Sequence, residues 1–399
     1  MLNTLANTFD KMRSFIKHNS YRLFKSFKAD IFSSEPLNAN SSGNVDRFIE
    51  SSMALSDSTC LAEPVETDWG GVNPVFITKT QPPVFANYHF NFFKGSPLKL
   101  QVYENVLYHP IYHCLYNSDG SRIDTSSYWT RQQQTPERID VPKMVFKSEE
   151  EFIYVGDYTA NMHYGHFLIE AIGPLYYLLN DDHTKILCNE VNRPFKSIFV
   201  DEFFNLADFK NDFCSFNKLV QVKKAIVPQH TLCFGYEAFS AHRLIPELIA
   251  KNVITDPKMT QQPVYFSRTR LNGLRKILNE EKLENTLQEA GVLIVYPETL
   301  SLKQQIEIVN KHSVIIACSG SALHTVLFDV LGNKTLIVIE DEDKYDKNFF
   351  IVDAIKSINS IYISALRQEI PSELHANRAV NRSLDIDFTI EGLKRIGII

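Results

Sequence analysis

The sequence lacks the short patterns that identify several common classes of protein. Its six cysteines are scattered and form no CxxC pair, so we expect reduced thiols rather than a disulfide framework or a zinc site. No Walker A sequence, GxGxxG or HExxH occurs, which disfavours a P-loop nucleotide, a standard dinucleotide and a zincin-type metal site. No apolar run reaches the length of a membrane span, and no signal peptide is recognisable. We therefore expect a cytoplasmic protein without a metal ion or a bound cofactor.

The composition is ordinary for a globular enzyme, and the charge balance is slightly acidic. Of the 399 residues, 44% are hydrophobic and 22% are charged, which are fractions typical of globular domains. This length suits two domains, each large enough to bury a core. The formal net charge of −6 provides no overall basic field, so we expect no nucleic-acid partner.

Residues 1–60 are predicted to form a basic amphipathic helix followed by a linker rich in Ser and Asn. Basic and apolar side chains are interleaved over the first thirty residues, a pattern typical of a peripheral contact with a membrane. The alternative is a docking helix or a partly ordered arm with a solvated basic face. The basic residues are Lys11, Arg13, Lys17, Arg22, Lys25 and Lys28.

Residues 61–256 are predicted to form a first domain. Up to about residue 150 the segments are short, aromatic and β-leaning, and Asp119-Gly120 fits a hairpin turn. Strand and helix then alternate, and Asp256-Pro257 breaks the pattern at the boundary of the domain. The expected strands are 152–156 and 197–201, and the expected helices are 163–181 and 238–252.

Residues 257–365 show a regular alternation of strand and helix. Asn279 is the expected N-cap of the first helix, Gly291 its left-handed stop, and Ser301 with Gln304 has the spacing of a capping box. Such alternation predicts a parallel sheet covered by helices, a Rossmann-like domain. The expected strands are 264–268, 292–296, 313–318 and 334–340, and the expected helices are 279–291, 301–312 and 322–332.

Two loops of this domain carry groups suited to an anion. Open parallel sheets bind ligands beyond the carboxyl ends of their strands. There Ser319-Gly320-Ser321 precedes a helix whose N-terminus carries about half a positive elementary charge, and His324 lies on its first turn. The loop after strand 264–268 carries cations that can pair with phosphate. The alternatives are small residues chosen for turn geometry and a solvated basic loop. The cations are Arg268, Arg270, Arg275 and Lys276.

His166 and Glu170 are four residues apart and therefore share one face of the apolar helix expected at 163–181. A charge in such a helix is costly unless it is paired or used. Either residue could act as a general base, or the two could form a structural pair. The spacing of Asp157, His163 and His166 matches no standard metal site.

Together these stretches resemble glycosyltransferase family 61 over about residues 150–340. The family has His where Ser319 stands, Thr-Asn at His324-Thr325, and Asn at His163. The matching stretches are Tyr164-Gly165-His166-Phe167-Leu168-Ile169-Glu170, Ser267-Arg268, Arg275, Asn279-Glu280, Pro297-Glu298-Thr299-Leu300-Ser301, Gln305, Ser319-Gly320-Ser321-Ala322-Leu323-His324-Thr325 and Phe328.

The resemblance implies a GT-B-like α/β architecture, with two Rossmann-like domains facing each other across a cleft. It also implies inversion at the anomeric carbon, no obligatory metal, and a tail at 366–399 that crosses back to the first domain. Glu170 is the expected general base, oriented by His166. The residues expected to bind the sugar donor are Arg268, Arg275, Asn279, Glu280, Ser319, Gly320, Ser321 and His324.

The expected function is transfer of a sugar from a nucleotide-diphosphate sugar to a glycan or lipid-linked glycan. We place it in capsule, lipopolysaccharide or exopolysaccharide synthesis, at the inner face of the cell membrane. One alternative is a pyruvyl or phospho-sugar transferase. The other is a catalytically inactive scaffold of a polysaccharide assembly complex. The departures from the family at Ser319 and His324-Thr325 favour the scaffold, whereas the retention of Glu170 and Arg268 argues against it.

Overall fold

The computed structural model describes Val72 and residues 74–79, 90–94, 98–126, 135–156, 163–188, 198–233, 237–271, 276–342, 345–368 and 381–399. The expected basic helix and linker at 1–60 lie outside these residues, as do Asp157 and Arg275. Within the described ranges, no helix is both long enough and apolar enough to cross a membrane.

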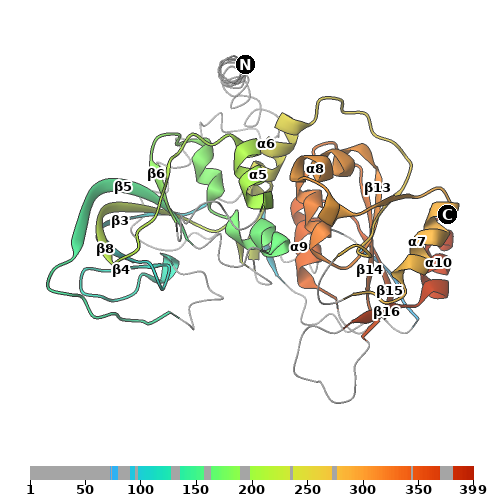
Figure 1. The fold of residues 1–399 in the computed structure, drawn as a ribbon, viewed down its shortest axis with the longest axis horizontal. Coiled ribbons are helices and arrows are strands. Elements are labelled where there is room, and N and C mark those ends of the chain that lie inside the picture. The colour runs from blue at the N-terminus through green and yellow to red at the C-terminus, as the bar shows by residue number, and fades with distance from the viewer. Residues whose placement is uncertain are drawn as a thin grey trace, which may run out of the picture. The chain divides into compact units, whose positions relative to one another are not determined.

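A seven-stranded sheet forms the core of the C-terminal half (Figure 1). Five of its strands run parallel in the order β15-β14-β13-β11-β12, which confirms the parallel sheet predicted from the alternation of strand and helix. The strands are β11 (Val264–Phe266), β12 (Leu293–Val295), β13 (Val314–Cys318), β14 (Thr335–Asp341) and β15 (Ile361–Gln368).

The order of these strands identifies the edge where a ligand is expected. The chain passes from β11 to β12 on one side, and then returns across β11 to form β13 on the other side. The connections that leave β11 and β13 therefore start from neighbouring strands and run in opposite directions. Such a switch point, at the carboxyl ends of the strands, is the usual ligand site of an open α/β sheet.

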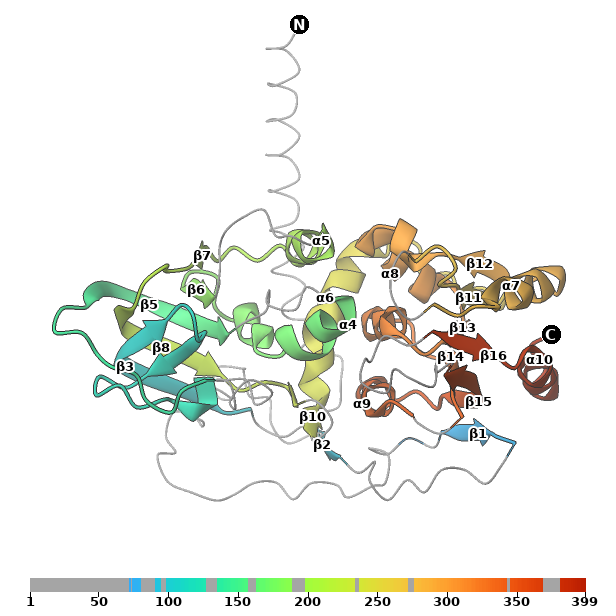
Figure 2. The same cartoon turned by 60° about the horizontal axis from the view of Figure 1, so that its bottom comes forward.

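Helices cover both faces of this sheet (Figure 2). On one face, Leu283 and Leu287 of α7 (Glu280–Glu289) and Leu393 of α10 (Ile386–Arg395) pack against Ile316 and Ile337 of the sheet. Burial of each such side chain stabilises the fold by about 1.5–3 kcal/mol. The other face carries the 3₁₀ segment η7 (Ser321–Phe328), α8 (Leu302–Lys311) and α9 (Lys347–Lys356).

All three predicted helix-end positions are confirmed, although one of them lacks a capping side-chain bond. Ser301 and Gln304 form a reciprocal capping box, and Gly291 takes a left-handed conformation with φ of 84°. Asn279 does occupy the N-cap position of α7, but its side chain makes no capping hydrogen bond. The amide group bonds instead to the backbone of Leu384, far along the chain.

The first half contains a mixed six-stranded sheet in the order β4-β3-β8-β5-β6-β7. Strand β3 is antiparallel to its neighbours, whereas β8, β5, β6 and β7 run parallel. The turn at Asp119-Gly120 is confirmed, with φ of 86° at Gly120. The strands are β3 (Leu100–His109), β4 (Cys114–Tyr116), β5 (Phe146–Gly156), β6 (Lys185–Cys188), β7 (Phe213–Cys214) and β8 (Val220–Pro228). A small separate sheet contains β2 (Asn91–Phe93), β9 (Leu232–Cys233) and β10 (Glu237–Phe239).

The strand predicted at 197–201 is wrong, because residues 198–201 begin helix α5 (Ile198–Ala207). Apolar residues recur along it at the three- and four-residue spacing of one helix face, which outweighs the β-branched residues at its start. The buried members of that face are Val200, Phe203, Phe204 and Ala207.

The helices predicted at 163–181 and 322–332 are not regular α-helices. The first is divided into α4 (Tyr164–His166), the π-helical turn η3 (Phe167–Ala171) and the 3₁₀ segment η4 (Leu175–Leu179). Gly173 and Pro174 interrupt it, since proline has no N–H to donate.

The second helix, η7, is 3₁₀ and ends at Phe328 rather than at Gly332. The carboxylate of Asp329 accepts the amide N–H groups of Leu331 and Gly332. This side chain therefore closes a turn that draws the backbone out of the helix.

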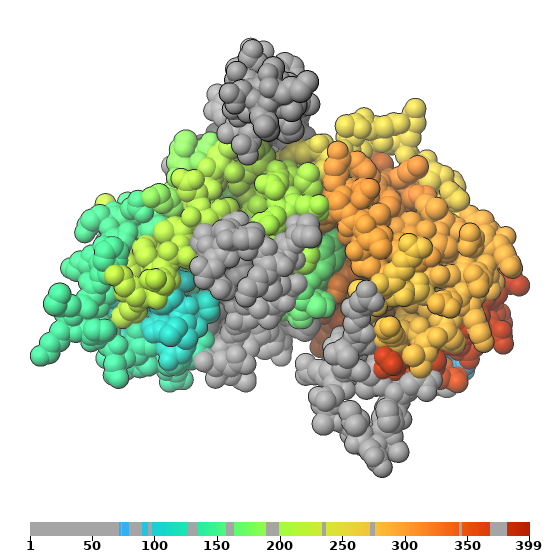
Figure 3. Space-filling view, in the orientation of Figure 1, coloured from blue at the N-terminus to red at the C-terminus, as the bar shows by residue number. Residues whose placement is uncertain are grey.

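Helices of the first half pack against α8 of the second. Both α5 and α6 (Leu244–Val253) contact α8, and Glu202 of α5 accepts the backbone N–H of Leu302 at the start of α8. The surface of residues 198–253 continues into that of α8 in the space-filling view (Figure 3).

Two segments at the ends of the chain join the C-terminal sheet. Strand β1 (Val75–Ile77), which lies in the range expected for the first domain, pairs in parallel with β15. Strand β16 (Arg382–Leu384) pairs antiparallel with β15, and α10 follows it. The described part of the tail, 381–399, thus packs on the C-terminal sheet, in place of the expected return to the first domain.

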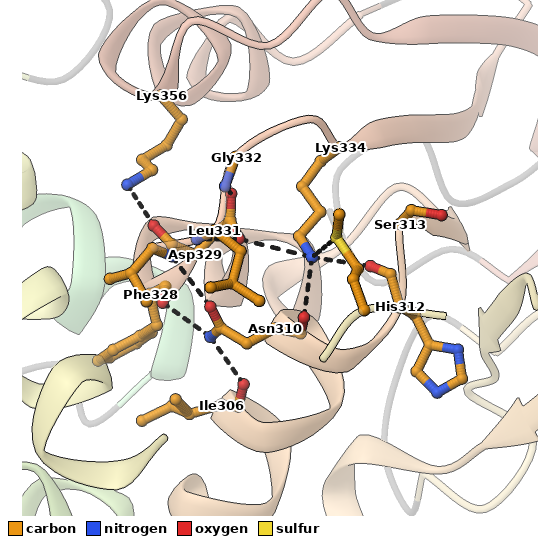
Figure 4. A network of polar contacts seen from close by, with 12 residues as sticks. Ile306, Asn310, His312, Ser313, Phe328, Asp329, Leu331, Gly332, Lys334 and Lys356 are labelled. Carbon is orange, nitrogen blue, oxygen red and sulfur yellow. Dashed lines mark hydrogen bonds and ion pairs between the residues drawn. The ribbon is translucent and has the colours of Figure 1, made fainter. Parts of the chain in front are cut away.

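A buried polar network surrounds Lys334 (Figure 4). Lys334 directly precedes β14 and thus lies at the amino end of that strand, opposite to the switch point. The Lys334 ammonium is 3.5 Å from the Asp329 carboxylate, and the two side chains are 0% and 3% exposed. Lys334 also donates to the carbonyl groups of Asn310 and His312. Lys356 of α9 donates to the Asp329 carbonyl and pairs with the Glu247 carboxylate. Two carboxylates and three carbonyl groups therefore surround the two buried cations.

Candidate functional site

Arg268 and Gly320 meet at the switch point of the C-terminal sheet. Arg268 follows β11, and its Nη1 donates to the Ser319 carbonyl at 2.9 Å. A Cβ atom on Gly320 would lie 2.8 Å from that nitrogen, so the absence of a side chain lets the guanidinium lie over the turn. The structure therefore brings the two predicted anion-binding loops together.

Ser319 makes several polar contacts, and its hydroxyl is hydrogen-bonded within the protein. Arg382 of β16 donates to the Ser319 hydroxyl at 3.3 Å and pairs with Asp341 at 2.8 Å. The hydroxyl in turn donates to the Glu340 carboxyl, whose pKa burial raises to about 8. Ser319 thus organises the turn, whereas Gly320 and Ser321 are less buried.

Glu280 and Asn279 lie behind the turn. The buried Glu280 carboxylate accepts the Arg268 backbone N–H at 2.9 Å and the Tyr265 hydroxyl at 2.8 Å, and burial raises its pKa. Asn279 is held by Leu384, as described above. Both side chains are therefore placed to position other residues.

The other cations of this loop diverge from the turn. Arg270 stacks on the ring of Tyr296, with its guanidinium carbon 3.7 Å from the ring centroid. Lys276 is exposed, and Arg275 lies outside the described residues. Of the four predicted cations, the structure places only Arg268 at the Gly320 turn within its described ranges.

His166 and Glu170 form a close pair beside the same turn. Their Nδ1 and Oε2 atoms are 3.2 Å apart, and the side chains are 42% and 13% exposed, so solvent reaches the pair. The segment that carries them lies against η7 (Figure 2). Tyr164 shares a hydrogen bond of 2.8 Å with Thr325.

Gly165 allows this close approach. A Cβ atom there would lie 2.9 Å from Ser321 Oγ and 3.0 Å from His324 Cδ2. His163 Nδ1 is 3.5 Å from the same Ser321 hydroxyl. A continuous series of contacts therefore links Arg268, through the Ser319–Ser321 turn, to the segment that carries His166 and Glu170.

Residues 164–338 match the family model of glycosyltransferase 61. The chain carries a glycosyltransferase 61 domain. This confirms the resemblance seen in the sequence motifs and identifies the protein as a glycosyltransferase. No curated protein matches the sequence significantly.

Glu170 of this glycosyltransferase 61 domain lies in the π-helical turn η3, which positions its side chain. The Ile172 amide bonds to the Phe167 carbonyl at 3.2 Å, a five-residue step that interrupts the regular α-helical pattern of bonds. π-helical turns occur frequently at functional sites.

Three residues that the sequence did not indicate, the buried Thr231 and His242 and the partly buried His230, bond to carbonyl groups of this segment. His242 bonds to the Leu168 carbonyl at 2.8 Å, and Thr231 donates to the Gly173 carbonyl at 3.0 Å. His230 bonds to the Glu170 carbonyl, and burial lowers its pKa to about 4. These residues lie far from the turn in the sequence; Thr231, for example, is 58 residues from Gly173. No local sequence pattern could therefore indicate them.

His324 does not present a cation to a phosphate. Its ring is buried and stacks on Phe349, with centroids 5.2 Å apart. Burial, together with the nearby His166 and His163, lowers its pKa to about 3. The neutral ring therefore packs η7 against α9, and its contact with a sugar donor stays a prediction.

The described part of the glycosyltransferase 61 domain contains neither a disulfide nor a cluster of potential metal ligands. Cys188, Cys214, Cys233 and Cys318 are free thiols, as is Cys114 outside the domain. Among the residues that the structure describes, no three His, Cys, Asp or Glu side chains gather as potential metal ligands.

Proposed function

We propose that the protein transfers a sugar from a nucleotide-diphosphate sugar to a glycan or lipid-linked glycan, with inversion at the anomeric carbon. The observation that carries this proposal is the position of Arg268 over the Gly320 turn, next to the segment that bears His166 and Glu170. A cation at a sheet switch point suits a diphosphate. A carboxylate paired with a histidine suits the removal of a proton.

In the proposed reaction, Glu170 takes the proton of the acceptor hydroxyl. The acceptor oxygen bonds to the anomeric carbon as the bond between that carbon and the diphosphate oxygen breaks. The electron pair leaves with the nucleoside diphosphate, and the oxocarbenium-like transition state resembles that of glycoside hydrolysis. Arg268 and the backbone N–H groups at Gly320 and Ser321 stabilise the charge of the leaving group, as fixed donors do in other group transfers.

Around this site we propose a GT-B-like arrangement, with an acceptor-side domain at 61–256 and a donor-binding domain at 257–365. The mixed first sheet and the parallel second sheet support two α/β units. We further propose that residues 1–30 contact the inner face of the cell membrane, where the product enters surface polysaccharide. The basic and apolar residues of that segment support this location.

Arg268→Ala is expected to weaken the binding of a nucleoside diphosphate by about ten- to a hundredfold, the range for a lost charged hydrogen bond. Isothermal titration calorimetry with UDP, GDP and ADP measures this change. Arg270→Ala is the matched control, because it removes an arginine two residues away that stacks on Tyr296. Equal affinity of the wild-type and Arg268→Ala proteins would remove Arg268 from the site.

Gly320→Ala is expected to weaken the same affinity by about two- to tenfold, the range for one uncharged hydrogen bond, with little change in Tm. The new Cβ would lie 2.8 Å from Arg268 Nη1, and this flexible guanidinium moves away more easily than the backbone. In an Arg268→Ala background the substitution should therefore have no further effect on affinity. A large fall in Tm with unchanged affinity would contradict this explanation.

Sugar transfer itself is tested by incubating the full-length protein with UDP-, GDP- and CMP-sugars and following release of the nucleotide. Release from a diphosphate sugar supports the proposal. Binding of none of these nucleotides, together with transfer of a pyruvyl or phospho-sugar group, would replace it with the alternative chemistry.

A further inference from the structure

The tail strand β16 brings a second arginine to the turn that Arg268 occupies. Arg268 Nη1 donates to the Ser319 carbonyl at 2.9 Å, and Arg382 Nη1 donates to the Ser319 hydroxyl at 3.3 Å. Two guanidinium groups thus bind one residue, at the switch point of the sheet. Arg382 lies beyond residues 164–338, which match the family model.

We propose that Arg382 is a second phosphate-binding residue of the sugar-donor site, and that it holds the diphosphate together with Arg268 across the Ser319–Gly320 turn. This inference rests on the proposed function. It also gives the C-terminal tail a role, because the strand that carries Arg382 would complete the site.

Several bonds hold Arg382 in place before any ligand arrives. Its guanidinium pairs with Asp341 at 2.8 Å, while the Arg382 backbone bonds to Lys276 and Leu278. Asn279 holds Leu384, two residues further along β16, through two hydrogen bonds of 2.8 Å. An arginine that is already ordered loses less conformational entropy on binding a ligand.

The exposure of the pair indicates that Arg382 reaches outward. Its side chain is 21% exposed, whereas that of Asp341 is only 7% exposed. Each guanidinium has five N–H donors in a planar fork, and the two contacts with Ser319 and Asp341 leave donors for an anion. Arg is well suited to phosphate for this reason.

The balance of charge at the turn also favours an anion. Asp341 offsets one of the two guanidinium groups, and Arg268 pairs with no carboxylate in the described part of the chain at ion-pair distance. Glu280 accepts the Arg268 backbone N–H from the interior. The Glu340 carboxyl, with a pKa of about 8, is mostly protonated at pH 7.

The experiment compares Arg382→Ala with wild type by calorimetry, using the best binder among UDP, GDP and ADP together with its parent nucleoside. Affinity for the diphosphate is expected to fall by about tenfold or more, whereas affinity for the nucleoside should change less than about twofold because only the phosphate contact is lost. Arg367→Ala is the matched control. Arg367 lies on the neighbouring strand β15 and pairs with Glu342 and Asp385.

A double variant separates phosphate binding from stability, since Arg382→Ala alone leaves Asp341 buried without its ion-pair partner. Arg382→Gln/Asp341→Asn replaces both charges with amides of similar shape, so its Tm is expected to return towards the wild-type value. Its affinity for the diphosphate should stay about tenfold low.

Three outcomes would overturn the inference. Wild-type affinity in Arg382→Ala, equal losses for diphosphate and nucleoside, or recovery of affinity in the double variant would each reduce Arg382 to a structural residue. In those cases the proposed function stands. If the wild-type protein binds none of the three diphosphates, the proposed function fails as well.

Discussion

Glu170→Gln is expected to slow sugar transfer by about 10²- to 10⁴-fold, the usual contribution of a general base, with unchanged affinity for the nucleoside diphosphate. Glutamine has nearly the same shape and leaves an amide beside His166, whose Nδ1 lies 3.2 Å from the Glu170 carboxylate. It cannot accept the proton of an acceptor hydroxyl. Single-turnover transfer with a saturating sugar donor measures the chemical step, and calorimetry measures binding.

The controls use the surroundings of Glu170. Glu289→Gln changes an exposed glutamate on α7 and should leave both measurements unchanged. His166→Asn should reduce the rate less than Glu170→Gln does, because in our proposal this histidine orients the base and does not accept the proton. Near-wild-type turnover in Glu170→Gln would exclude the base assignment, whichever nucleotide binds.

The regular part of the fold could be read from the sequence because local signals agree there. The strands from 264 to 340 are apolar runs, most of them buried, and a capping box and a left-handed glycine mark the helix ends next to one of them. Each signal acts over a few residues, so single-sequence patterns were sufficient to predict the parallel sheet. The strand order, which defines the switch point, came only from the structure.

Features that depend on distant residues could not be read in the same way. The π-helical turn at Glu170 depends on His230, Thr231 and His242, which supply hydrogen bonds from elsewhere in the chain. The sequence likewise indicated Arg268 but not Arg382, because β16 reaches the turn only through pairing with β15.

The loop at Ser319 and the following turn show that a residue in a motif need not bind the ligand that its type suggests. The Ser319 hydroxyl stands at the expected position, yet it is already hydrogen-bonded to Arg382 and Glu340. His324 is buried and neutral against Phe349. Burial and partners determine what these side chains can offer to a ligand, and neither property is visible in a motif.

Lys334→Met is expected to destabilise the protein by about 3–5 kcal/mol, the cost of removing one partner of a buried ion pair. The substitution leaves the Asp329 carboxylate in the interior, 3% exposed, and leaves the carbonyl groups of Asn310 and His312 without this donor. The midpoint of urea unfolding measures the loss. Lys258→Met is the control, because its pair with Asp256 has both side chains exposed, 87% and 67%, and surface pairs contribute at most about 1 kcal/mol.

The double variant Lys334→Met/Asp329→Asn tests whether the buried charge is the cause. If it is, the second substitution should restore part of the lost stability, although Asp329 also accepts the amides of Leu331 and Gly332. If Lys334→Met lost as little stability as Lys258→Met, the ion pair of Lys334 and Asp329 would not be buried away from water as the structure shows. Because the network lies at the edge opposite to the Gly320 turn, nucleotide affinity of the folded variant should match wild type, which separates the requirements of the scaffold from those of the site.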